Sequence, residues 1–308
     1  MPELAEVEAY RRLAAARALN RPIDAVEAPD AWYLKGGITG PALSAALADR
    51  RLVSADRRGK LLMLATSGDG PVLGLRFGMS GRLVVDGHAG IDDLWYSSNR
   101  DEAKWDRFGL RFADGGLLVM RDPRRLGGVS LDPPVERLGP DALDISLAQL
   151  RHALAGRRPR VAVVSGGKVP ASKVPASKVA ASKVAASAAV SDPGFELGRP
   201  ELAGPSIKGR LLDQSRLAGV GNLAADEMLW RARLAPDRPA AGLSDAELRR
   251  LHRHLRTTLA QMIEHGGSHT GTLMPQRRPG GICPKDGTPL VHATIATRST
   301  WWCPLHQR

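Results

Sequence analysis

The chain opens with the octapeptide Met1-Pro2-Glu3-Leu4-Ala5-Glu6-Val7-Glu8. Removal of the initiator methionine would leave Pro2 as the N-terminal residue. Its α-amine, with an ordinary pKa of roughly 7.7 to 8.0, is a nucleophile whenever it is neutral. Glu3 lies beside it and offers a proton donor or a negative charge. Because proline is favoured in the first turn of any helix, these residues alone leave a purely structural role open.

This opening predicts a helix over residues 2–19. Acidic side chains in its first turns favour the positive end of a helix dipole. Apolar side chains recur at a spacing that places them on one face, at Leu4, Val7, Tyr10 and Leu13. Asn20 and Pro22 follow and end the helix.

From about residue 50 to 130 the pattern changes to short apolar segments separated by turns rich in glycine and aspartate. The predicted strands are Leu61–Leu64, Val72–Phe77, Arg82–Val85, Leu110–Phe112 and Leu117–Met120. This spacing is typical of an antiparallel sandwich or barrel, and the lack of helical repeats between the segments disfavours a parallel sheet.

The composition points to a polyanionic partner. The formal net charge is +12 and the isoelectric point is about 10.4, which most simply indicates nucleic acid. No apolar run is long enough for a transmembrane helix, and no secretory signal is present. The two cysteines, Cys283 and Cys303, argue for a reducing compartment. We therefore expect a cytoplasmic protein, nucleoid-associated if bacterial, with no membrane partner.

A repeat of five residues fills the segment 165–192, with lysines at Lys168, Lys173, Lys178 and Lys183. The segment offers no large side chain to bury, so the sequence predicts a disordered cationic linker. Its lysines either attract phosphates without specificity or serve as a solubilising spacer.

Helical patterns return at 206–265. Ser206–Gln214 and Asn222–Ala232 predict two short helices joined by a turn with two glycines, Gly219 and Gly221. A capping box, Ser244 to Glu247, opens a longer helix with an apolar face. Such helix–turn–helix units often present backbone amides to a phosphate, although ordinary helix packing produces the same pattern.

The C-terminal segment carries two pairs of possible metal ligands. Cys283 precedes Asp286 and Cys303 precedes His306, each with two residues between. Two such turns joined by a β-hairpin bring four ligands together in a zinc ribbon. Aspartate is uncommon in structural zinc sites, so a hairpin that binds no metal is the alternative.

Several stretches together resemble the formamidopyrimidine-DNA glycosylase/endonuclease VIII family. The first is Pro2-Glu3-Leu4 with Glu6-Val7-Glu8. The others are Arg57–Lys60, Gly78–Leu83, Asp122–Gly127, Ile207-Lys208 with Leu211–Gln214, Ala218–Asn222 with Ala225–Glu227, and Arg298–Thr300. They follow the family's order from one end of the chain to the other, and only the repeat segment lies outside.

The resemblance implies a bifunctional DNA glycosylase and abasic-site lyase. Pro2 would attack the sugar C1′ of a flipped-out damaged nucleotide, with Glu3 as the acid/base beside the sugar. Lys60 would bind a phosphate next to the lesion and assist elimination. The remaining positions bind DNA: Lys208, Asn222 and Arg298 at phosphates, and Met79, Arg124 and Leu126 in the gap of the duplex.

Four departures from the family pattern bear on which base is removed. Leu126 replaces the usual phenylalanine, Ala224 a tyrosine and Ala5 a proline, and the stretch Ser268–Ile282 is short. Oxidised purines (8-oxoguanine and formamidopyrimidines) are the first expectation, and oxidised pyrimidines, as for endonuclease VIII, are the alternative. A non-catalytic damaged-DNA-binding protein and a zinc-ribbon transcription or translation factor are rival functions. Only the enzyme explains why Pro2 and Glu3 are both present.

We therefore predict a multidomain α+β protein, a monomer that binds damaged or abasic double-stranded DNA and structural Zn²⁺. Its parts are a β-sandwich catalytic domain with a leading helix (1–150), a basic low-complexity linker (151–198), a helix–two-turns–helix domain (199–267) and a zinc-ribbon-like β-hairpin (268–308).

Overall fold

The computed structural model describes residues 2–91, 94, 100, 102–155 and 204–308. The predicted linker falls almost entirely outside these residues. Within them the α-helices are α1 (Leu4–Arg17), α2 (Gly40–Leu47), α3 (Leu147–Leu154), α4 (Ile207–Leu212), α5 (Asn222–Arg231) and α6 (Asp245–Glu264). None of these helices is long and apolar enough to cross a membrane.

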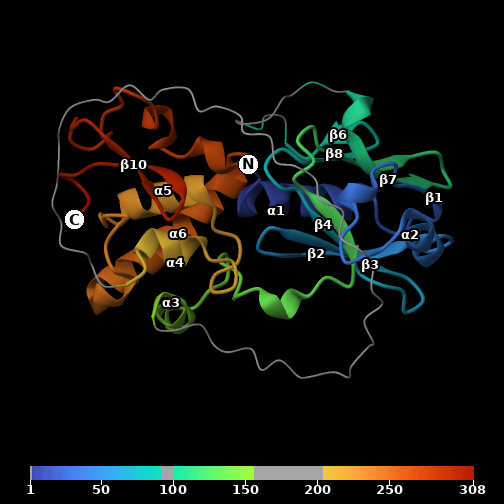
Figure 1. Ribbon diagram of the computed structural model, residues 1–308, viewed down its shortest axis with the longest axis horizontal. Helices are drawn as coiled ribbons and strands as arrows, with labels where there is room; N and C mark the ends of the chain where they lie inside the picture. Colours follow the sequence, from blue (N-terminus) through green and yellow to red (C-terminus); the bar gives the residue numbers. More distant parts are fainter. Residues whose placement is uncertain (1, 92–93, 95–99, 101, 156–203) are drawn as a thin grey trace, which may run out of the picture. The chain divides into compact units, whose positions relative to one another are not determined.

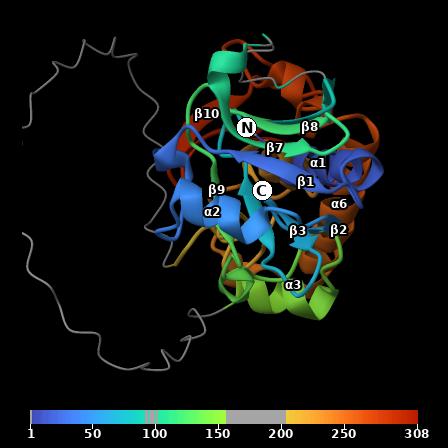
Figure 2. The same ribbon diagram turned by 90° about the vertical axis from the view of Figure 1, so that its right-hand side faces the viewer.

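Two antiparallel sheets form the N-terminal half. One has the order β1 (Ile23–Glu27), β7 (Asp106–Phe112), β8 (Leu117–Arg121), β5 (Arg82–Val85), β6 (His88–Ala89). The other has the order β2 (Leu52–Arg58), β3 (Leu61–Thr66), β4 (Leu73–Arg76), β9 (Gly128–Leu131). Figure 2 shows β7 and β8 of the first sheet above β2 and β3 of the second. Apolar side chains of both sheets belong to one buried core, among them Leu62, Leu75, Phe108 and Leu118. The predicted antiparallel sandwich is confirmed.

Helix α1 connects this sandwich to the helical half of the protein. It contacts β2, β3 and β5 on one side and α6 on the other, and Figure 1 shows it between the two groups of elements. Its first residues, Leu4 and Ala5, pack in the core of the helical half. One turn later Val7 and Tyr10 pack in the core of the sandwich. The opening residues of the chain are therefore held where the two cores meet.

The helical half packs α3, α4, α5 and α6 around a second core. Serine side chains cap three of these helices: Ser146 at α3, Ser206 at α4 and Ser244 at α6. Helix α3 crosses the predicted boundary at residue 150, and its Leu150 and Leu154 are buried in this second core. The domain limits remain a prediction. After α6 the chain ends in the antiparallel hairpin β10 (Val291–Ile295) and β11 (Arg298–Trp302).

The cap of α6 gives a prediction for stability against pH. Glu247 accepts a hydrogen bond from the Ser244 amide at 2.9 Å and forms an ion pair with Arg238 at 2.7 Å. The Arg238 guanidinium and the Ser244 donors lower the pKa of Glu247 from 4.5 to about 2. We expect Glu247→Gln to lower the free energy of unfolding by about 1 kcal/mol near neutral pH.

Because the pKa of Glu247 is lower in the folded state, this stabilisation is complete above the unfolded value of 4.5 and is lost as the pH falls toward about 2. Urea titrations of both proteins at several pH values measure the effect. A gap in unfolding free energy that stays constant down to about pH 3 would contradict the assignment.

Candidate active site

The carboxyl group of Glu3 lies at the N-terminus of α5. Glu3 is 1% exposed, and its two oxygens accept hydrogen bonds from the backbone amides of Leu223, at 2.9 Å, and Ala224, at 3.1 Å. These amides are among the unpaired donors of the first turn of α5, where the helix dipole is positive. A side chain on α1 thus caps α5, and Pro2, also buried, is held directly beside this contact.

Gly221 makes this contact possible. A Cβ atom at this position would lie 2.1 Å from Cδ of Glu3, closer than any two such atoms can approach. Gly221 is the N-cap of α5, and Asn222 is the first helical residue rather than the cap. Gly221, the second glycine of the turn between α4 and α5, is therefore required because a side chain there would collide with Glu3.

Burial shifts the pKa of Glu3 and that of Lys60 toward each other. Burial raises the pKa of Glu3, and Glu6 adds to the rise, whereas Lys60 opposes it. Burial lowers the pKa of Lys60, and Arg298 adds to the fall, whereas Glu3 and Glu6 oppose it. Glu3, Lys60 and Arg298 therefore lie close enough for their charges to interact. A carboxyl and an amine whose pKa values move toward neutrality are suited to proton transfer.

Glu6 orients the first turn of α1. Its Oε2 accepts a hydrogen bond from the Glu3 amide at 2.8 Å, and its Oε1 accepts from both the amide and the hydroxyl of Ser268 at 2.6 Å. The carboxylate is 2% exposed, so all these bonds are shielded from water. The sequence placed Glu6 at the positive end of the helix and in the opening motif, but its bonds to Ser268 were not predicted, because Ser268 is 262 positions away.

An ion-pair network supports the turn that carries Lys60. The guanidinium of Arg57, 5% exposed, binds Asp141 at 2.7 Å and Glu8 at 3.2 Å. Asp141 also accepts a hydrogen bond from the Gly59 amide at 2.6 Å. Gly59 has a φ of 58°, which a residue with a side chain adopts only with strain. The turn that carries Lys60 is thus bound to Asp141, both directly through Gly59 and through Arg57.

A pocket of about 420 Å³ opens next to Glu3. Its lining residues are Glu3, Met79, Asn222, Leu223, Arg277, Thr297, Arg298, Ser299 and Trp301. It therefore brings together four of the residues predicted from sequence, which come from α1, the loop before β5, α5 and β11. Arg277, Thr297 and Trp301 were not predicted as site residues, and Ser299 was named only as part of the motif Arg298–Thr300.

Lys208 lies behind this pocket rather than in it. It is fully buried, and its Nζ lies 2.6 Å from both Asp226 Oδ1 and Thr300 Oγ1. The other oxygen of Asp226 binds Arg277 at 2.8 Å. Lys208 thus ties α4 to α5 and β11, and its predicted contact with a DNA phosphate remains a prediction.

Asn222 and Arg298 flank the hairpin edge of the pocket. The Asn222 side-chain amide donates to the Ser299 carbonyl at 2.9 Å, and its Oδ1 is buried without a partner in the described residues. The hairpin turn just before Arg298 consists of Ala296 and Thr297, with φ of 50° and 60°. Two-residue hairpin turns with positive φ usually contain glycine or asparagine. Backbone strain is therefore concentrated where Arg298 is presented.

The predicted wedge residues lie on two loops joined by Asp122. Asp122 is fully buried and accepts hydrogen bonds from the Ser80 hydroxyl at 2.5 Å and the Gly127 amide at 2.9 Å. This carboxylate thus ties the loop that carries Met79 to the loop that carries Leu126.

The two loops touch, and their side chains are available to a partner. A Cβ at Gly78 would lie 2.3 Å from the carbonyl carbon of Leu126. Leu126 is 52% exposed, and Arg124 is exposed on the same loop. The neighbouring Arg125 is instead bound to Asp30 by two contacts of 2.6 Å. Met79 lines the pocket, whereas Arg124 and Leu126 lie outside it.

Three of the four predicted metal ligands converge. Ligand atoms of Cys283, Asp286 and Cys303 all lie within 4.8 Å of one another. His306 is not part of this group, and its ring lies 5.8 Å from that of Trp230. The Trp230 indole N–H points at Cys283 Sγ, 3.4 Å away, and the His306 amide at Cys303 Sγ, 3.2 Å away. Buried thiols beside a carboxylate, with N–H donors aimed at the sulfurs, are a donor set that fits zinc.

The pocket beside Glu3 combines the groups that nucleophilic and acid–base chemistry requires. A proline amine, a buried carboxyl and a lysine lie near one another, and cationic side chains surround the pocket. Met79, which is partly buried and lines the pocket, and Leu126, which is exposed, lie on two loops that touch each other. Such a set suits nucleophilic attack on an anionic ligand.

Comparisons with known proteins agree with this geometry. Residues 1–129 match the family model described as the formamidopyrimidine-DNA glycosylase N-terminal domain, and residues 202–273 match the formamidopyrimidine-DNA glycosylase H2TH domain. The formamidopyrimidine-DNA glycosylase of Thermus thermophilus is 33% identical, over 100% of this chain and 98% of its own. That of Heliobacterium modesticaldum is 30% identical, over 100% of both chains.

Solved structures share the fold. The Lactococcus lactis Fpg, in a complex with DNA that contains an abasic site, superposes with a TM-score of 0.71 at 22% identity over 100% of both chains. A structure of MutM with DNA that contains carbocyclic 8-oxo-G also superposes with a TM-score of 0.71, at 23% identity.

Proposed function

The chain belongs to the formamidopyrimidine-DNA glycosylase family, and we propose that it is a base-excision-repair DNA glycosylase with abasic-site lyase activity. The observation that carries this proposal is the Glu3 carboxyl, which caps α5 beside Pro2 in a pocket that also contains Asn222 and Arg298. The substrate is double-stranded DNA with a damaged base.

In the proposed reaction, the neutral amine of Pro2 attacks C1′ of the damaged nucleotide. The bond between C1′ and the base breaks, and the base leaves with the electron pair and takes up a proton. Glu3 donates a proton at the sugar ring oxygen, which opens the ring and leaves an iminium between Pro2 and C1′. The raised pKa of Glu3 supports this role, because it keeps the carboxyl protonated at higher pH.

Strand cleavage follows by β- and then δ-elimination. A base removes a proton from C2′, and the bond between C3′ and the phosphate oxygen breaks. Lys60, with a pKa lowered by burial, would hold the neighbouring phosphate and assist this step. Asn222 keeps one amide hydrogen for a second phosphate, because its other contact is to Ser299. Arg298 supplies a further positive charge at the same edge.

Oxidised purines are the proposed substrates. Arg124 is exposed and extends from the same loop as Leu126, where it would face the base opposite the lesion. Met79 and Leu126 would fill the gap left by the flipped nucleotide. Related structures hold DNA with FAPY-dG, with carbocyclic 8-oxo-G and with an oxidised pyrimidine, so each of these lesion types is tested.

Borohydride trapping on a panel of duplexes tests the proposal. The panel contains an abasic site, 8-oxoguanine, a formamidopyrimidine, an oxidised pyrimidine and an undamaged control. We expect a covalent adduct on the abasic and oxidised-purine duplexes. Trapping of the oxidised pyrimidine alone among the damaged bases would replace the purine assignment. Binding without any adduct would favour a non-catalytic damaged-DNA-binding protein.

We also propose that Cys283, Asp286 and Cys303 hold structural Zn²⁺. The ion would tie the loop at residue 283 to the end of β11, and so would support the strand that begins at Arg298. No step of the reaction needs it.

Replacing one thiol is expected to remove the metal. Cys303→Ser should lower zinc content from about one ion per chain to nearly none, and should lower the melting temperature. Plasma mass spectrometry of the dialysed protein measures the metal. His306→Ala decides the fourth position: loss of zinc would make His306 a ligand, and retention would leave that position to another group. Full zinc content in Cys303→Ser would contradict the site.

A further inference from the structure

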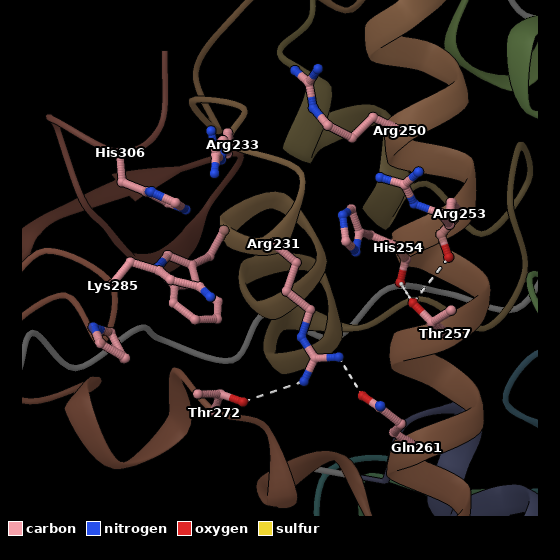
Figure 3. Close-up of a pocket in the computed structure, with 12 residues that line it drawn as sticks. Arg231, Arg233, Arg250, Arg253, His254, Thr257, Gln261, Thr272, Lys285 and His306 are labelled. Atoms are coloured by element: carbon pink, nitrogen blue, oxygen red, sulfur yellow. Dashed lines mark hydrogen bonds between the residues drawn. The ribbon is translucent and has the colours of Figure 1, made fainter.

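A second pocket lies at the opposite end of α5 from Glu3. Its volume is about 730 Å³, and it is bounded by the C-terminus of α5, one face of α6 and the loop at residues 284–285. Figure 3 shows Arg250, Arg253 and His254 on the α6 side and Lys285 and His306 across from them. We call it the basic pocket, because its lining among the described residues includes no acidic residue and five cationic ones: Arg231, Arg233, Arg250, Arg253 and Lys285.

The cations of this pocket differ in how far they are neutralised. Arg231 forms an ion pair with Glu227 at 2.7 Å. Arg250 donates a hydrogen bond to the Ala232 carbonyl at the end of α5, at 2.6 Å, and forms no ion pair with the described acids. Within the described part of the chain, the side chains of Arg233, Arg253 and Lys285 form neither an ion pair nor a hydrogen bond.

Several arginines elsewhere in the described residues are bound by carboxylates, among them Arg21, Arg57, Arg125, Arg238 and Arg277. The basic pocket instead gathers Arg233, Arg253 and Lys285, which are exposed and for which the described residues offer no acid. Arg250 and Arg253 also lie three residues apart on α6, a spacing at which like charges repel. This arrangement costs stability unless an anion balances it.

The pKa of His254 reflects the positive charges around the pocket. Its pKa is lowered by burial and then by three arginines, Arg253, Arg231 and Arg250. The neighbouring positive charges thus disfavour a further proton on the imidazole. An anion bound in the pocket would reduce this repulsion.

We propose that the basic pocket binds a compact ligand with several phosphate groups. Guanidinium groups bind phosphate through two parallel hydrogen bonds, and those of Arg233 and Arg253 are uncommitted. The volume lies within the range of small-ligand sites and exceeds the pocket at Glu3. The proposed ligand is a free oligophosphate, such as a nucleoside triphosphate, and stronger competition by a nucleic-acid strand is the opposing outcome of the test. The proposal is independent of the chemistry at Pro2.

Isothermal titration of the full chain with tripolyphosphate at physiological ionic strength tests it. The test variant is Arg233→Gln/Arg253→Gln. The matched control is Arg249→Gln/Arg256→Gln, which removes the same charge from exposed positions of α6 that do not line the basic pocket. We expect saturable binding that weakens at least tenfold in the test variant and changes less than about twofold in the control.

Two further measurements separate the outcomes. The melting temperature of the unbound test variant should equal or exceed that of the wild type, because the substitutions relieve repulsion and remove no ion pair. Competition with adenosine triphosphate and with a single-stranded oligonucleotide names the source of the phosphates. Absence of saturable binding by the wild type, or equal weakening in both variants, would overturn the proposal.

Discussion

Strand cleavage at an abasic site is expected to fall by about 10³-fold when Pro2 is replaced by glycine. The secondary amine of Pro2 would form the iminium, and its ring holds the nitrogen in one direction beside Glu3. Glycine keeps a primary amine but loses this fixed geometry, so a weak residual reaction is expected. Single-turnover cleavage of an abasic duplex measures the rate.

Three controls accompany this variant. Intact mass must show that Met1 is absent from both proteins, since the reaction needs a free amine at residue 2. Affinity for a duplex with a non-cleavable abasic analogue should change less than about threefold, because Pro2 supplies chemistry rather than phosphate contacts. Peptide mapping of the wild-type adduct should place the DNA on Pro2. An adduct on Lys60 instead, or cleavage at an unchanged rate, would remove Pro2 from its proposed role.

Local patterns were enough to predict most of the elements that carry the site. Short apolar segments between turns predicted the strands β3, β5 and β8 to within two residues, and the Ser244 capping box predicted the start of α6. Motifs named Glu3, Met79, Asn222 and Arg298, which the fold gathers in one pocket although they are up to 295 positions apart in the chain. The resemblance to a family motif identifies these residues by their order in the chain, so it does not depend on knowing which of them are in contact.

Roles that depend on a distant partner could not be predicted. Ser268 matters because Glu6 accepts two hydrogen bonds from it. Asp226 was part of the motif Ala225–Glu227, but its ion pairs with Lys208 and Arg277 were not predicted. The residues of α3 were divided between the predicted sandwich domain and the predicted linker, because their burial depends on α4 and α6 rather than on neighbours in sequence. No local pattern shows that Lys208 is fully buried, and its contact with a DNA phosphate stays a prediction.

Base excision is expected to fall by about 10²- to 10⁴-fold in Glu3→Gln, the range over which a positioned acid contributes. The amide has nearly the same shape but supplies no acidic proton. Its NH₂ group would also face one of the amides of Leu223 and Ala224, which leaves a buried donor unpaired at a cost of about 1–3 kcal/mol. Trapping at a preformed abasic site should fall much less, because that aldehyde needs no departing base.

The pH profile distinguishes lost chemistry from lost structure. Burial raises the pKa of Glu3 above its ordinary 4.5, so the protonated acid persists to higher pH and excision by the wild type should decline as pH rises through that pKa. Glu3→Gln has no such group, and its residual rate should lack this decline. Glu8→Gln is the matched control, because Glu8 is buried on the same helix but lies outside the pocket, and Arg57 keeps its pair with Asp141. If Glu8→Gln lowers the excision rate as much as Glu3→Gln does, the loss would come from a disturbed α1 rather than from a missing acid. That outcome would contradict the catalytic role of Glu3.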